Sequence, residues 1–134
     1  MPTILEAVGT YIDNNSVTLT LGTNLFLAKM PDTPDVCVCV YEYEGFAPIE
    51  AFGATAFEVN RPSVQIAVRA GRDDYPAARD LADTLRTLVS GMSNVTVGSV
   101  LVMRVASSGS LYSLGADALD RPRVVFNLDC HVDV

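Results

Sequence analysis

Several residue types that carry chemistry are scarce in this chain. Its 134 residues include no tryptophan, one histidine and three cysteines. An odd number of cysteines does not make a disulfide framework, so we expect free thiols in a reducing compartment. Cys37 and Cys39 form a C-x-C pair, but zinc needs two further ligands. Cys130 and His131 cannot supply both, because neighbours on a strand point to opposite faces. We therefore expect no metal and no cofactor, and interpret the cysteines as buried side chains.

Long apolar runs and clustered cations are missing as well. No stretch approaches the roughly 18 apolar residues of a membrane span, and we expect neither a membrane partner nor a signal peptide. Residues 1–60 hold eight acidic residues against Lys29, a balance of −7, whereas residues 61–134 hold eight acids and eight arginines. Tight binding of nucleic acid needs clustered cations, so the composition excludes a DNA-gripping protein. An acidic wall would instead let DNA slide past it.

Apolar residues, in contrast, are abundant. They make up 49% of the chain, and the mean hydropathy is +0.29. A domain of this length has a small interior, so part of the apolar surface must lie outside, where it usually marks contacts between proteins. The composition therefore predicts an oligomer or a component of an assembly.

Hydrophobic periodicity predicts two helices, over residues 2–15 and 71–91, the second capped by Asp73 or Asp74 and ended by Gly91. It also predicts strands, over residues 17–21, 24–30, 36–43, 62–70, 100–106 and 123–134. In the third of these, Cys37 and Cys39 share one face and the valines the other, which is typical of a strand buried on both sides. We expect a single α+β domain over residues 1–134, a mostly antiparallel sheet flanked by two helices.

Two connections stand out because they are long and apolar, at residues 45–62 and 107–115. Long loops without secondary structure are uncommon and are often functional. We expect both to dock on partners. The candidate interface residues are Phe46, Ile49, Phe52, Phe57, Leu111, Tyr112 and Leu114.

A catalytic site is harder to assemble from these residues. His131 lies between Asp129 and Asp133 on one predicted strand face, and Asp–His pairs orient catalytic bases. A nucleophile is missing, because no G-x-S-x-G is present and Cys130 points the other way. Arg69, Arg72, Arg79 and Arg86 interleave with acids, so we interpret them as surface ion pairs. We expect no catalytic residues. A small-molecule-binding or enzymatic domain that uses Asp129 and His131 is the less favoured alternative.

Three segments together resemble one protein family: "GTNLFLAKMPDTPDVCVCVYEYEG", "RPSVQIAVRAGRDDYPAARDLADTLRTLVSGMSN" and "RPRVVFNLDCHVDV". They are similar to the tail terminator proteins of long-tailed bacteriophages, also described as minor capsid or tail completion proteins. The double cysteine departs from the aliphatic pattern of the family, at positions we interpret as core.

The resemblance implies a virion protein with no enzymatic activity, placed at the tail–neck region after assembly in the host cytoplasm. It implies a homo-oligomeric ring, commonly hexameric, that binds the last ring of tail tube protein, stops tube polymerisation and meets the head-completion or neck proteins. Another neck or tail-tube component, such as a head–tail joining protein, is the near alternative. DNA would pass through the lumen without specific binding. We expect the acidic half to line that lumen, through Glu42, Glu44, Glu50 and Glu58.

Overall fold

A computed structural model describes residues 3–50 and 58–133 of the chain, and of residues 44–50 and 58 it describes the backbone alone. The helices are α1 (Ile4–Asn15) and α2 (Tyr75–Ser90). The strands are β1 (Leu25–Leu27), β2 (Cys37–Glu50), β3 (Glu58–Arg69), β4 (Ser93–Val97), β5 (Val100–Ser107), β6 (Tyr112–Ala116) and β7 (Pro122–Asp133). The predicted α+β class is confirmed.

The strands form one seven-stranded sheet in the order β1-β2-β3-β7-β5-β4, with β6 also paired to β7. All pairs are antiparallel except β1 with β2. The strands β5 and β6 share one edge of β7: β6 pairs with residues 122–125 and β5 with residues 128–133. The last strand of the chain is therefore central to the sheet.

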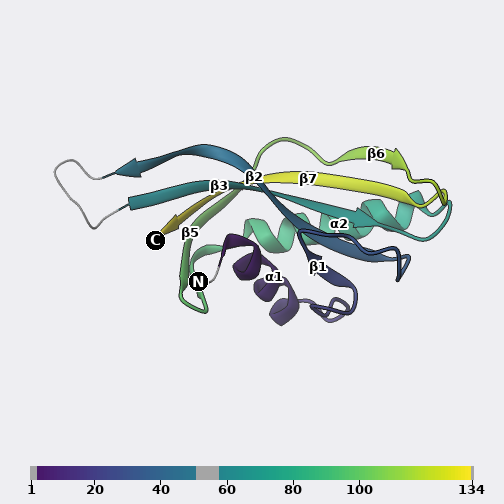
Figure 1. Cartoon of the computed structure of the whole chain (residues 1–134), viewed down its shortest axis with the longest axis horizontal. Coiled ribbons are helices and arrows are strands. Elements are labelled where there is room, and N and C mark those ends of the chain that lie inside the picture. Colours follow the sequence, from purple (N-terminus) through teal and green to yellow (C-terminus); the bar gives the residue numbers. More distant parts are fainter. Residues whose placement is uncertain (1–2, 51–57, 134) are drawn as a thin grey trace.

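Both helices pack on one face of this sheet, below it in the view of Figure 1. In α1 the buried residues Ile4, Val8 and Ile12 recur at helical spacing, and Thr3 caps the helix by accepting a hydrogen bond from the Glu6 N–H. Helix α2 begins after Asp74, whose carboxylate accepts from the Ala77 N–H, and ends at Gly91. The predicted caps of the second helix are thus confirmed for Asp74 and Gly91.

The core lies between the helices and alternate residues of the central strands. Phe126 and Leu128 of β7 and Ile66 of β3 are fully buried in it. The prediction that Val38 and Val40 face one way and Cys37 and Cys39 the other is also confirmed, because all four side chains are completely buried while only the valines join the helix-side core.

Some of the predicted boundaries are wrong. Residues 17–21 make no strand: Val17 is fully exposed and only Leu21 forms a bridge, to Leu25. Residues 45–50 and 58–62 belong to strands and not to a loop, because β2 runs to Glu50 and β3 starts at Glu58; residues 51–57 of this predicted connection lie outside the described residues. The pairing absorbs Gly45 and Pro48 through register shifts between Tyr43 and Ile49. Strands β4 and β6 were not predicted.

Candidate functional site on the open face of the sheet

Among residues 3–50 and 58–133, no helix covers the sheet face opposite α1 and α2. It is built from the alternate residues of β2, β3 and β7 that point away from the core. Figure 1 shows β6 above this side of the sheet and both helices below it. A sheet with one solvated face is normal for antiparallel pairing, and its polar residues are expected there.

Polar and aromatic side chains cross this face in register. Tyr41, Gln65 and Asn127 are direct cross-strand neighbours on β2, β3 and β7. The Gln65 amide donates to Asn127 Oδ1 at 3.2 Å, and both amides lie within 3.4 Å of the Tyr112 hydroxyl. Tyr112 thus fastens β6 across the sheet while its ring stays 40% exposed.

A hollow of about 340 Å³ lies on the same face, over the small side chain of Ala67. Met30 and Tyr41 line one side of it, and Leu114, Asp117 and Arg123 line the other. Burial raises the pKa of Tyr41 to about 12, and its hydrogen bond with Cys39 acts in the same direction. This phenol is therefore neutral at physiological pH. A second hollow, of about 330 Å³, adjoins the first along Tyr41, Tyr43, Gln65 and Asn127.

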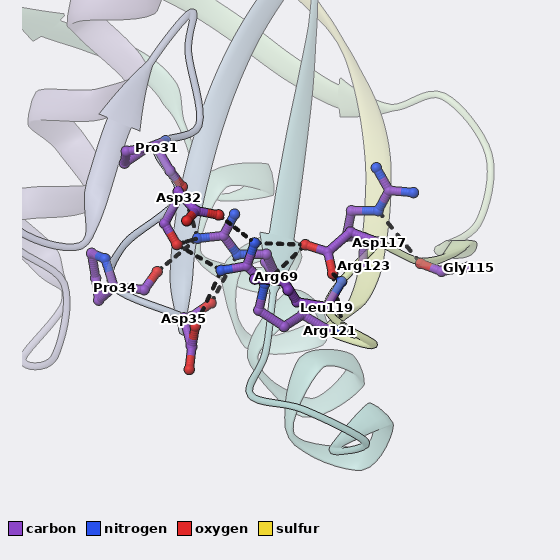
Figure 2. A network of polar contacts seen from close by, with 10 residues as sticks. All are labelled: Pro31, Asp32, Pro34, Asp35, Arg69, Gly115, Asp117, Leu119, Arg121 and Arg123. Atoms are coloured by element: carbon purple, nitrogen blue, oxygen red, sulfur yellow. Dashed lines mark hydrogen bonds and ion pairs between the residues drawn. The ribbon is translucent and has the colours of Figure 1, made fainter.

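Arg69 closes one end of the first hollow and is only 4% exposed. Its Nε donates to the Asp35 carbonyl at 2.9 Å, and its Nη2 donates to the carbonyls of Pro31, Asp32 and Pro34 at 2.7–3.2 Å. One guanidinium therefore holds the connection between β1 and β2 against the open face (Figure 2). This also explains why Cys37, directly paired with Arg69, is buried on that face.

Arg121 fastens the same connection from the other side, and its side chain is 6% exposed. It pairs with Asp32, Asp35 and Asp117 at 2.9–3.1 Å and donates to the Asp32 carbonyl. Desolvation alone would raise the pKa of Asp117, but hydrogen bonds from the backbone and side chain of Arg121 and from the Leu119 N–H lower it to about 2. The Asp117 carboxylate is thus ionised and committed to Arg121.

Sequence reasoning missed both arginines. It interpreted Arg69 as one of a line of surface ion pairs, whereas the structure buries it against four carbonyls. The available signal was its position at the end of an alternating strand, with a proline-rich and acidic segment, residues 31–35, elsewhere in the chain. Which segment it would meet depends on strand order, which the sequence does not state.

The hairpin formed by β2 and β3 is the second notable feature. Its strands run to the left in Figure 1, where β3 stays paired with β7 as far as Val59 opposite Asp133. Backbone pairing continues through Phe46 with Arg61 and Ile49 with Val59 to Glu50 with Glu58. Glutamates are the charged residues of β2, and Glu58 lies opposite its last residue. The part of the hairpin over residues 42–61 is therefore acidic, with four glutamates against Arg61.

The predicted interface residues fall in three places. Phe46 and Ile49 belong to β2 of the hairpin, where only their backbone is described. Phe52 and Phe57 lie outside the described residues. Tyr112 and Leu114 lie on β6 and are 40% and 47% exposed. Leu111 instead packs in the core at 7% exposure, because its side chain points to the helix side of the sheet. Their interface role stays a prediction.

The predicted lumen residues all lie on the hairpin. Glu42 is exposed on β2, and the backbone of Glu44, Glu50 and Glu58 follows the same two strands. The four residues thus lie on two neighbouring strands of the sheet. Whether these strands line a lumen stays a prediction.

The alternative catalytic residues have other neighbours in the sheet. Asp129 accepts a hydrogen bond from the Ser63 hydroxyl at 2.9 Å, and His131 pairs across the sheet with Arg104. Burial raises the pKa of all three cysteines, that of Cys130 to about 12. Within residues 3–50 and 58–133, no group of three acidic, histidine or cysteine side chains could hold a metal ion. Neither described helix is long and apolar enough to cross a membrane.

Comparison with known proteins gives one family. The family model described as "Bacteriophage tail terminator protein" matches residues 11–134 of this chain. A solved structure whose name states no function has the same fold, with a TM-score of 0.54 and 15% identity over 96% of this chain and 89% of the other. At that identity the likeness concerns the fold alone. No curated protein matches the sequence.

Proposed function

Because this chain belongs to the bacteriophage tail terminator family and is thus a structural protein of the phage tail, we propose that it forms the ring that caps the tail tube. In this role it stops tube polymerisation and joins the tail to the head–neck proteins. The family match over residues 11–134 is the observation that carries the proposal.

The fold supports an assembling subunit. One sheet face is covered by helices, and the other presents exposed aromatic and aliphatic side chains, among them Tyr43 at 42%, Tyr112 at 40% and Leu114 at 47% exposure. Exposed apolar side chains grouped on one face are typical of protein contacts. A ring needs a heterologous contact, in which one patch of each copy binds a different patch of the next copy and the rotation closes. A hexamer is the copy number that we propose.

Termination follows from a ring with two unlike faces. One face binds the end of the tail tube, and the other offers no surface on which a further tube subunit can dock. Six weak contacts made together hold firmly, because binding one subunit raises the effective concentration of the next contact. The tube protein and the head-completion proteins are therefore the proposed partners, and the neck of the virion is the proposed location.

The acidic hairpin fits a bore through which DNA slides. Carboxylates repel phosphates, so an acidic wall gives DNA little to bind. The test neutralises the four hairpin glutamates together, as Glu42→Gln, Glu44→Gln, Glu50→Gln and Glu58→Gln. The matched control neutralises four acids of the helices, as Glu6→Gln, Asp13→Asn, Asp80→Asn and Asp83→Asn. We expect slower DNA ejection in the first variant only, and equal ejection rates would refute the acidic bore.

The ring and its binding site are tested with purified protein. Size-exclusion chromatography with light scattering should give the mass of a closed ring, about six times the 14.3 kDa chain. Mixed with tail tubes and viewed by negative-stain microscopy, the protein should decorate one tube end. A monomer that leaves tube ends bare would contradict the proposal, and binding at the head vertex alone would favour a head–tail joining protein.

A further inference from the structure

The connection between β1 and β2, residues 28–36, lies against the sheet without an apolar anchor, and we call it the strap. None of its side chains is buried. Within the described residues, its one backbone–backbone hydrogen bond runs from the Ala28 N–H to the Val40 carbonyl, where the strap leaves β1. Segments that bury few apolar side chains open at a lower free energy than the core. The strap therefore depends on side chains of other elements to stay in place.

Two buried guanidinium groups hold the strap against the open face of the sheet. Arg69 donates to strap carbonyls at 2.7–3.2 Å. Arg121 donates to the Asp32 carbonyl at 2.6 Å and pairs with the carboxylates of Asp32 and Asp35 at 2.9 and 3.1 Å. On its other side Arg121 pairs with Asp117, as Figure 2 shows. Because hydrogen bonds that involve ionised groups are the strong ones, the attachment of the strap is concentrated in two side chains.

The strap covers two thiols. Cys37 and Cys39 point to the open face, where neither described helix reaches, and yet both are completely buried. The Cys39 sulfur contacts the backbone of Lys29 at one end of the strap. Burial raises the pKa of the Cys37 thiol, and the nearby Asp35 carboxylate, at the other end of the strap, acts in the same direction. Both ends of the strap therefore lie close to these thiols.

We propose that the strap is a hinged cover, which opens as a unit and uncovers Cys37 and Cys39 while the core between the sheet and the helices stays folded. The strap contributes no side chain to that core, so its release requires only that the two guanidinium groups give up their contacts. Opening adds to the exposed apolar surface of the open face, and Arg69 and Arg121 thus control how much of this surface the subunit presents. The inference goes beyond the proposed role at the tail and does not require a ring.

The chain contains its own reporters for this motion. Cys37 and Cys39 lie under the strap, whereas Cys130 belongs to the core on the helix side of the sheet. A maleimide reagent, added at pH 8 in urea well below the unfolding midpoint, labels each thiol at a rate set by how often that thiol is uncovered. Mass spectrometry of the digested full-length protein gives these rates. The ratio of the strap thiols to Cys130 then measures strap opening apart from unfolding.

Arg121→Ala removes one of the two guanidinium groups. It should raise this labelling ratio by about tenfold or more, because several charge-assisted hydrogen bonds are lost. The matched control is Arg86→Ala, which removes an arginine paired with Asp83 on α2 and should change the ratio by less than about twofold. Phe126→Ala weakens the core without touching the strap and should not raise the ratio. If the ratio in Arg121→Ala equals that in Arg86→Ala, all three thiols are uncovered together and the inference is overturned.

A second variant keeps the test decisive if Arg121→Ala does not fold. Asp32→Asn and Asp35→Asn together remove the carboxylates of the strap, whose side chains are 80% and 64% exposed, and leave Arg121 paired with Asp117. The circular dichroism spectrum should stay unchanged, and the labelling ratio should rise above that of the Arg86→Ala control. A ratio equal to the control would overturn the inference.

Discussion

Replacing Arg69 by alanine should cost more stability than replacing any surface arginine of this chain. The side chain is 4% exposed, and its guanidinium satisfies four carbonyls in the 31–35 segment. A hydrogen bond from a charged donor contributes about 1.5–3 kcal/mol, and the contributions do not add fully. Because these carbonyls lie in a surface connection, water will rehydrate some of them after truncation. We expect a loss of about 3–4 kcal/mol in the free energy of unfolding.

The assay is urea unfolding of the full chain followed by circular dichroism, at fixed protein concentration because assembly adds to stability. With a slope of about 2 kcal/mol per molar urea, the midpoint should fall by about 1.5–2 M. Arg69→Lys keeps the charge but cannot reach four acceptors at once, so we expect about half of that loss.

The matched control is Arg72→Ala. Its side chain is 72% exposed and pairs with Asp120 at 3.2 Å. Exposed pairs contribute about 0–1 kcal/mol, so this midpoint should move by less than about 0.5 M. An Arg69→Ala midpoint within the range of this control would show that the buried guanidinium does not hold the segment.

Three further predictions concern the rest of the chain. The pKa of Asp117 in the folded protein is lowered to about 2, so the ionised carboxylate contributes its full stabilisation above about pH 4 and loses it as the pH falls toward 2. The melting temperature should therefore drop between about pH 4 and pH 2. Asp117→Asn should remove the part of this drop that comes from Asp117. Burial raises the pKa of the thiols of Cys37, Cys39 and Cys130, so a thiol reagent should label them in denaturant but not in the native protein at pH 8; fast native labelling would contradict their placement. Phe126→Ala empties a fully buried site, and urea unfolding should show a loss of about 3–5 kcal/mol; a loss below about 1 kcal/mol would contradict its place in the core.

The sequence was most informative where a residue pattern is repeated. Phe126, Leu128 and Cys130 alternate with polar residues in β7, and the apolar stripe of α2 recurs at helical spacing between capping residues. These periodic signals follow directly from side-chain geometry. They predicted the helices, the central strands and the burial of Cys37 and Cys39.

The sequence was least informative where pairing overrides composition. Gly45 and Pro48 indicated a loop, yet β3 supplies a partner strand and the register shifts absorb both residues. Strand β6 has no buried side chain, so it shows no alternation, and its pairing with β7 defines it. Propensity is a weak guide in strands because neighbours decide the outcome.

The candidate site could not be predicted from the sequence, for a related reason. Arg69, Arg121 and Arg123 come together because β3 and β7 are adjacent and β7 follows a turn at residues 117–120. Arg69 is at least 52 residues away from Arg121 and Arg123 in the sequence. No sequence-spacing rule predicts contacts between residues so far apart. Tyr112 and Leu114 were selected as candidate interface residues, and the structure shows them exposed.

Electron microscopy of particles made without this chain is the decisive test of the proposed tail-capping role. We predict tails of uncontrolled length, or finished heads that stay unjoined, and a return to uniform joined tails when the intact chain is supplied. Uniform tails joined to heads in the absence of the chain would contradict it.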